Sequence, residues 1–72
     1  MKIKTLTNLM RVYEVIKTEH YIRVENISQL CNIKRSILNN YLITLLNLGL
    51  ITYDIRAGSK VYHPIVITKG YI

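Results

Sequence analysis

Apolar residues recur along the first quarter of the chain with the spacing of a helix that buries one face. The helix is predicted to start after Thr5 or Thr7, either of which could cap it, and to run to about Thr18. At about 100° per residue its apolar positions fall on one side. Val12 lies at the edge of this side and Val15 points away from it. Exposed valines here could be incidental or could belong to a subunit contact. The predicted buried stripe consists of Leu6, Leu9, Met10, Tyr13, Ile16 and the stem of Lys17.

The middle of the chain predicts one short strand and two helices separated by a tight turn. Residues 21–24 alternate and are rich in β-branched side chains, which favours a strand. Asn26 then opens a short helix, and a longer helix covers about residues 34–48. Asn32 lies between the helices and tolerates the left-handed conformation of a tight turn. The short helix is expected to turn Ile27, Leu30 and Cys31 inward and Ser28 and Gln29 outward, and the long helix to bury Leu38, Tyr41, Leu42, Leu45 and Leu48.

The last third of the chain predicts a β-hairpin. Gly49 supplies the stop of the long helix. Two β-rich segments, residues 50–56 and 60–68, flank a turn at Ala57-Gly58-Ser59. Thr68-Lys69-Gly70 has the pattern of the N-cap of a further helix. The order helix, strand, helix, turn, helix, hairpin predicts one α+β domain over residues 1–72.

Composition and charge narrow the class of protein. Half of the 72 residues are apolar and only 19% are charged, which excludes a disordered tail. Ten Lys and Arg against four Asp and Glu give a net charge of +6, which suggests an anionic partner such as nucleic acid or a membrane surface. No apolar run approaches the roughly 18–20 residues that span a bilayer, and no signal peptide is evident. The single Cys31 excludes an intramolecular disulfide and fits a reducing compartment. These features together lead us to expect a cytoplasmic protein without a membrane partner.

The central segment resembles the winged helix-turn-helix of MarR-, ArsR- and PadR-like regulators. The resemblance rests on residues 27–31, on the exit 49–51 and on residues 67–70, which are similar to the exit of the wing; it covers nearly the whole chain. It implies that helix 34–48 enters the major groove of double-stranded DNA and that the wing at 56–60 contacts the backbone or the minor groove. The compact turn at Asn32 and the missing C-terminal helix, through which many relatives dimerise, depart from the family pattern. The residues that match its spacing are Ile33, Leu38, Leu42, Leu45, Gly49 and Leu50.

The polar side chains of the long helix and of the hairpin tip are the candidates for DNA contact. The N-terminal residues of a helix in the major groove usually reach the base edges, where Asn can pair with adenine and Arg or Lys with guanine. Asn39 and Asn40 are poor helix formers, so either a functional need or a tolerant solvated face explains them. Arg23, Lys2 and Lys4 could add phosphate contacts or be plain solvated charge. The candidate DNA-binding residues are Lys34, Arg35, Ser36, Asn39, Asn40, Arg56, Ser59 and Lys60.

The sequence offers no pattern of catalytic or metal-binding residues. His20 and His63 have no carboxylate or thiol at ligand spacing, and the acidic residues are scattered. We therefore expect no catalysis, no cofactor, no metal and no small-molecule ligand. Cys31 is expected to be a buried structural thiol, and Tyr53 and Tyr62 could pair across the hairpin. Tyr13 and Tyr41 fit the core stripes.

Three functions from different classes fit these features. The first is sequence-preferring binding of double-stranded DNA by a small transcription regulator acting as a homodimer. The second is a protein-interaction module of the same fold, with Val12, Val15 and Ile43 as its apolar contacts. The third is non-specific coating of nucleic acid by charge alone.

Overall fold

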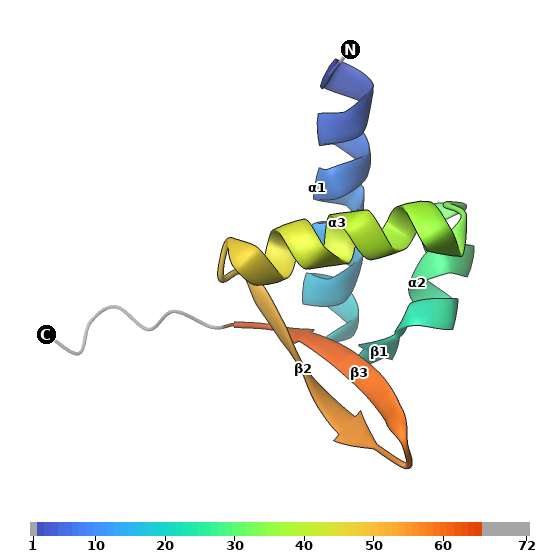
Figure 1. Ribbon diagram of the computed structural model, residues 1–72, viewed down its shortest axis with the longest axis vertical. Helices are drawn as coiled ribbons and strands as arrows, with labels where there is room; N and C mark the ends of the chain where they lie inside the picture. Colours follow the sequence, from blue (N-terminus) through green and yellow to red (C-terminus); the bar gives the residue numbers. More distant parts are fainter. Residues whose placement is uncertain (1, 66–72) are drawn as a thin grey trace, which may run out of the picture.

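The computed structural model describes residues 2–65 of the chain, with side chains from residue 7 onward. Its strands form one antiparallel sheet in the order β1-β3-β2. In Figure 1, α3 lies across α1, and the β2–β3 hairpin projects away from the helices. The predicted α+β class is confirmed. The elements in chain order are α1 (Lys2–Glu19), β1 (Ile22–Arg23), α2 (Val24–Cys31), α3 (Arg35–Asn47), β2 (Ile51–Arg56) and β3 (Ser59–Pro64).

One apolar core holds the three helices against one face of the sheet. No polar or charged residue is buried among those whose side chains the structure describes. Burial of aliphatic side chains is therefore the main source of stability in this small domain. The largest fully buried side chains are Ile16, Ile27, Leu38, Leu42, Leu45, Ile51, Val12 and Cys31.

The buried side of α1 overlaps the predicted stripe but is shifted toward Val12. Ile16 is fully buried, and Leu9 and Tyr13 pack against the core, as predicted. Val12 is fully buried, whereas Met10, placed on the predicted stripe, is 60% exposed. Residues two apart on a helix point in directions that differ by about 200°. When Val12 faces the core, Met10 therefore faces away from it. The helix also starts at Lys2, before both threonines proposed as caps. The side chains of Lys2, Lys4 and Leu6 lie outside the described part of the chain.

The strand β1 and the helix α2 share a boundary that the sequence pattern misplaced. Val24 is the first residue of α2 and not the last of the strand, and α2 therefore begins before Asn26. Leu30, predicted to point inward, is 57% exposed. Ser28, predicted to point outward, is half-buried, because its hydroxyl donates to the carbonyl of Ile33 at 2.6 Å.

The turn between α2 and α3 follows the prediction. Asn32 is left-handed, with φ 55° and ψ 47°, and its backbone N–H caps α2. The three central leucines of α3 are buried as expected, and Tyr41 is half-buried. Leu48 was predicted to be buried and is 61% exposed, because α3 ends at Asn47 and the chain then turns away at Gly49, whose φ is +76°.

The hairpin closes through a two-residue turn, one residue shorter than predicted. Ala57 and Gly58 both have positive φ, 52° and 79°, as a type I′ turn requires. The predicted pairing of Tyr53 with Tyr62 is confirmed: they are opposite each other with ring centroids 5.6 Å apart. The predicted end of the second strand, the wing exit at 67–70 and the helix cap at Thr68 lie outside the described residues.

Truncation of Leu38 should destabilise the fold strongly. A fully buried leucine replaced by alanine loses about 2–5 kcal/mol, whereas a domain of this length is stable by only roughly 4–11 kcal/mol. Urea denaturation followed by circular dichroism measures the change. The matched control is Ile43→Ala on the same helix, where the side chain is 54% exposed and the change should stay within about 0.5 kcal/mol. Equal losses at the two positions would contradict this description of the core.

Ionisation of Cys31 should weaken the fold at alkaline pH. Burial raises the pKa of its thiol, against a smaller lowering by the Arg11 guanidinium. A raised pKa in the folded state favours the neutral thiol. The resulting stabilisation is complete below the pKa of the unfolded thiol, about 8.5, and is lost as the pH rises through the folded-state pKa. We expect the free energy of unfolding, measured in urea, to fall more steeply above about pH 8.5 in the native protein than in Cys31→Ala. Parallel pH profiles would contradict the prediction.

Candidate nucleic-acid interface

An open cleft of about 330 Å³ separates the first half of α3 from the hairpin. Arg35 and Asn39 line it from α3, and Ser59 and Lys60 line it from the hairpin. The structure thus brings four of the eight predicted DNA-binding residues around one concavity, although they are far apart in sequence.

Packing of α3 explains why two of these residues face the hairpin. Arg35 and Asn39 are one helical turn apart and therefore lie on the same side of α3. Leu38 and Leu42 are buried on the adjoining side. The position of the leucines fixes the rotation of α3 about its axis, and this rotation sets the direction of both polar side chains.

The other predicted residues of α3 lie on its solvent face. Lys34, Ser36 and Asn40 are exposed but do not line the cleft. Ile43, one turn beyond Asn40, is also exposed. The solvent face of α3 and the cleft thus adjoin each other around the helix.

The start of α3 is electropositive. Lys34 is the N-cap residue and makes no side-chain capping bond, and the first turn contains no acidic residue. The N–H groups at a helix start carry partial positive charge, to which Lys34 and Arg35 add two full charges. An anion approaching this end of α3 would be attracted.

The hairpin places Lys60 by its register. Lys60 is opposite Ile55, and its ammonium lies 4.7 Å from the centroid of the Tyr53 ring. Tyr53 and Lys60 therefore share the face of the hairpin that carries Tyr62, which also lines the cleft. Burial, and secondarily the neighbouring Tyr53, raises the pKa of the Tyr62 hydroxyl above its ordinary value.

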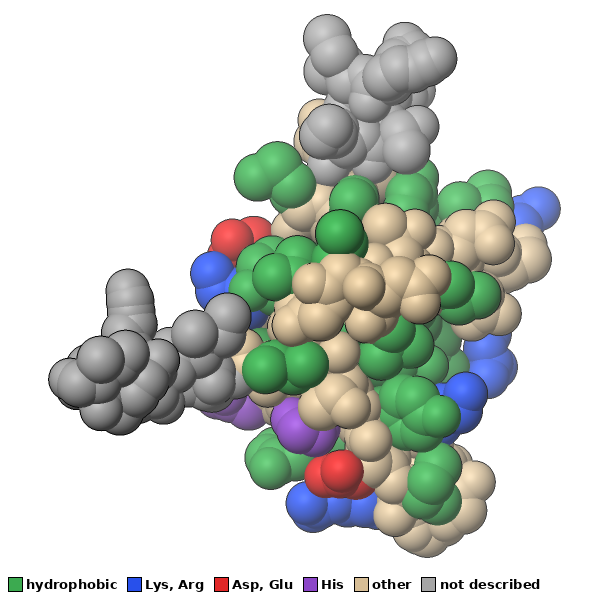
Figure 2. All heavy atoms as spheres, turned by 60° about the vertical axis from the view of Figure 1, so that its left-hand side comes forward, with side chains coloured by type: hydrophobic (Ala, Val, Ile, Leu, Met, Phe, Trp, Pro, Cys, Tyr) green, Lys and Arg blue, Asp and Glu red, His purple; other side chains and the backbone are tan. Residues whose placement is uncertain are grey.

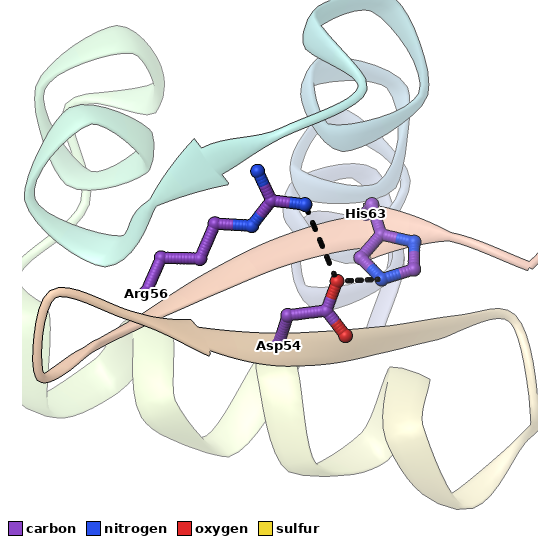
Figure 3. Close-up of polar contacts among 3 residues, drawn as sticks. All are labelled: Asp54, Arg56 and His63. Atoms are coloured by element: carbon purple, nitrogen blue, oxygen red, sulfur yellow. Dashed lines mark ion pairs between the residues drawn. The ribbon is translucent and has the colours of Figure 1, made fainter.

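Arg56, the remaining predicted residue, lies on the other face of the hairpin. Its guanidinium is 3.8 Å from the carboxylate of Asp54 and 4.8 Å from the centroid of the Tyr21 ring. Figure 3 shows Arg56 and His63 on either side of Asp54. On the face shown in Figure 2, acidic, basic and histidine side chains adjoin one another in the lower part of the molecule. The structure therefore does not bring Arg56 into the cleft.

The same cluster gives His63 a carboxylate that the sequence spacing did not reveal. The ring Nε2 lies 3.5 Å from the Asp54 carboxylate, and the ring centroid is 5.1 Å from that of Tyr21. Asp54 is paired with Val61, which makes His63 its diagonal neighbour on the same face of the sheet. The contact could be found only with the hairpin register in hand.

Three side chains that line the cleft were not predicted from the sequence: Val24, Glu25 and Tyr62. Glu25, in the first turn of α2, brings the one acidic side chain among the residues that line the cleft, and Tyr62 contributes an aromatic ring. Nothing local in the sequence marks Glu25, because its place depends on how α2 packs beside the hairpin. Tyr62 could have been assigned from its pairing with Tyr53.

The described part of the chain has neither a cluster of metal-binding side chains nor a helix able to span a membrane. It contains no group of three or more His, Cys, Asp or Glu side chains that could hold a metal ion. None of its helices is both long enough and apolar enough to cross a membrane.

Comparisons with family models, with curated proteins and with solved structures find no match to this chain. Its function must therefore be inferred from the arrangement of its own side chains. The arrangement to be explained is a cleft that is lined by two cations, one carboxylate and an amide, and bordered by an exposed helix face on which Lys34, Ser36 and Asn40 adjoin Ile43.

Proposed function

We propose that this protein is a winged helix-turn-helix transcription regulator that binds double-stranded DNA with sequence preference. The order of its elements supports the fold: α2, the tight turn at Asn32 and α3 correspond to a helix-turn-helix, and the β2–β3 hairpin to the wing. We infer that it works in the cytoplasm, where the lone thiol of Cys31 stays reduced.

The observation that carries the proposal is the shared cleft. Arg35 and Asn39 of α3 face Ser59 and Lys60 of the hairpin across a concave, basic surface. A duplex presents a groove flanked by two ridges of phosphate, so a protein that reads it needs a base-reading element beside a phosphate-binding one. The helix and the hairpin tip supply these two elements on adjoining surfaces.

The dimensions and side chains of α3 suit the major groove. The groove is about 12 Å wide and admits one α-helix. Arg35 can donate two hydrogen bonds to guanine, and Asn39 and Asn40 can each pair with adenine. Ser36, on the solvent face, can bond to either a base or a phosphate. In this arrangement the base-reading side chains are exposed before binding and need no rearrangement of the core.

The basic side chains at the margins would bind the phosphates. Lys34 at the start of α3 and Lys60 on the hairpin carry positive charge, and Ser59 adds a hydroxyl donor. Each neutralised phosphate releases counterions, so affinity should fall steeply with salt. Glu25 would repel any phosphate that entered the cleft at its own position, which restricts how the backbone can lie.

The structure weakens one of the alternatives. For a protein-interaction module, Val12, Val15 and Ile43 could be the apolar contacts, but Val12 is fully buried and so offers no surface to a partner. The other alternative, non-specific coating of nucleic acid by charge, would need neither a cleft nor amide side chains. Alanine variants of Asn39 and Asn40 separate it from sequence-preferring binding.

Neutralising Lys60 should weaken DNA binding more than neutralising Arg56. Lys60→Gln and Arg56→Gln each remove one positive charge from the hairpin, so the loss of net charge is the same. Lys60 lines the cleft, whereas Arg56 is held on the other face by Asp54 and Tyr21. We expect Lys60→Gln to lower the affinity for a duplex several-fold and to reduce the slope of log K against log salt by about 1. Fluorescence anisotropy titrations at several salt concentrations measure both quantities.

Two outcomes would contradict the proposal that DNA binds at the cleft. Equal losses for the two variants would mean that only the total charge matters. Absence of binding by the native protein at low salt would overturn the proposal as a whole.

Replacing Asn39 and Asn40 with alanine should remove sequence preference while leaving non-specific binding nearly unchanged. Each lost base contact costs about 1–3 kcal/mol of specific binding, and alanine favours the helix. The measurement is the ratio of affinities for a selected site and for a random duplex, in each single variant. A ratio of one for the native protein, or an unchanged ratio in both variants, would favour non-specific coating.

A further inference from the structure

A second hollow, of about 420 Å³, lies between α1 and α2 and shares no residue with the cleft. Met10 and Leu30 border it and are 60% and 57% exposed. Both have the spacing of core residues, yet nothing among the described residues covers them. Val15 and Arg11 continue the border along α1. An apolar hollow with uncovered core-type residues is typical of a surface that a partner protein buries.

Along α1 the residues of this surface form one stripe. Met10, Arg11, Glu14 and Val15 follow the spacing of a single helix face, and Thr7 lies one turn earlier. Glu14 has a 61% exposed side chain and is paired with Lys17 at 3.6 Å. The stripe therefore combines two apolar residues with one cation and one anion.

We propose that this surface binds a second copy of the same chain, with the two α1 helices antiparallel about a twofold axis. An axis passing beside the midpoint between Val12 and Tyr13 brings Arg11 level with Glu14 of the second copy. It also brings Met10 level with Val15 of the second copy. By symmetry each pair occurs twice. The stripe is complementary to itself in charge and apolar character, as a closed twofold interface requires.

The contacts of Arg11 support this assignment. Its guanidinium donates to the carbonyl oxygen of Cys31 at 2.9 Å, at the end of α2. This bond holds the charge beside the hollow, and a guanidinium has further N–H groups for a carboxylate. A preorganised cation loses less side-chain entropy when it pairs with an anion.

The net charge of the chain requires that opposite charges meet where two copies touch. Each copy carries a net charge of +6, so two copies repel each other unless the contact is locally matched. Two Arg11–Glu14 pairs provide this match, and Met10, Val15 and Leu30 provide the apolar area. The inference does not rest on the proposed DNA binding, because the surface and the cleft have no residue in common.

The test is the molar mass of the full chain, without DNA, by sedimentation equilibrium over about a hundredfold range of concentration. We expect a reversible monomer–dimer equilibrium. Glu14→Arg places two like-charged pairs across the axis and should raise the dissociation constant about tenfold or more. Glu19→Arg carries the same net charge, lies on α1 outside the stripe, and should change it less than about twofold.

The double variant Arg11→Glu/Glu14→Arg decides between pairing and mere loss of structure. Arg11→Glu alone and the double variant both lack the bond to Cys31. Arg11→Glu lowers the native net charge of +6 by two, whereas the double variant keeps it, so the general repulsion between copies acts against the expected tightening. We expect the double variant to dimerise about tenfold more tightly than Arg11→Glu. Circular dichroism of each variant checks that it is folded.

The apolar part of the surface has its own matched pair. Met10→Ser and Leu48→Ser each remove one exposed large side chain, at 60% and 61% exposure, and only Met10 borders the hollow. Met10→Ser should weaken the dimer several-fold and Leu48→Ser should not. A native chain that stays monomeric throughout, a double variant no tighter than Arg11→Glu, or equal effects of the two serine variants would overturn the proposal.

Discussion

The packing of the α3 leucines into the core is the interaction on which the rest of the structure depends. Leu38, Leu42 and Leu45 are at most 1% exposed and belong to one cluster with residues from α1, α2 and the sheet. Because they fix how α3 is rotated, they also fix where Arg35 and Asn39 point. A helix with a looser core contact would present its polar residues in several directions, and the cleft would have no defined shape. The shape of the cleft is thus a consequence of the core.

The two-residue turn sets the second half of the interface in the same indirect way. With Ala57 and Gly58 at positive φ, Arg56 is opposite Ser59, and Lys60 is opposite Ile55. Successive residues of a strand point to opposite faces, so Arg56 and Lys60 are separated onto the two faces of the hairpin. Ala57 is strained in this conformation, because its Cβ disfavours positive φ. The separation of the two cations therefore costs some stability and is enforced by the register.

The limits of sequence reasoning follow from these constraints. The three central leucines of α3 and the turns at Asn32 and Gly49 depend on local pattern, and all were predictable. The Tyr53–Tyr62 pair also needs the two-residue turn, because the predicted three-residue turn would have put Asp54 opposite Tyr62. The choice between Met10 and Val12 as the buried residue was not, because both fit an amphipathic helix and only the partner elements decide. The position of Arg56 failed for a different reason: a three-residue turn would have put it opposite Lys60, and one residue of register reverses the face. The cluster around His63 depends on that register as well.

The exposure of Met10 and Leu30 connects the size of the domain to its assembly. A chain of 72 residues buries only about 60% of its unfolded surface, so its helices have more apolar positions than one thin core can cover. If a second copy covers the remainder, folding and association become linked, and stability rises with protein concentration. The same linkage would join DNA binding to assembly, because two clefts held by one twofold interface can engage two half-sites of a palindrome. The residues that the monomer leaves uncovered would then allow so small a domain to bind a DNA site longer than one helix can reach.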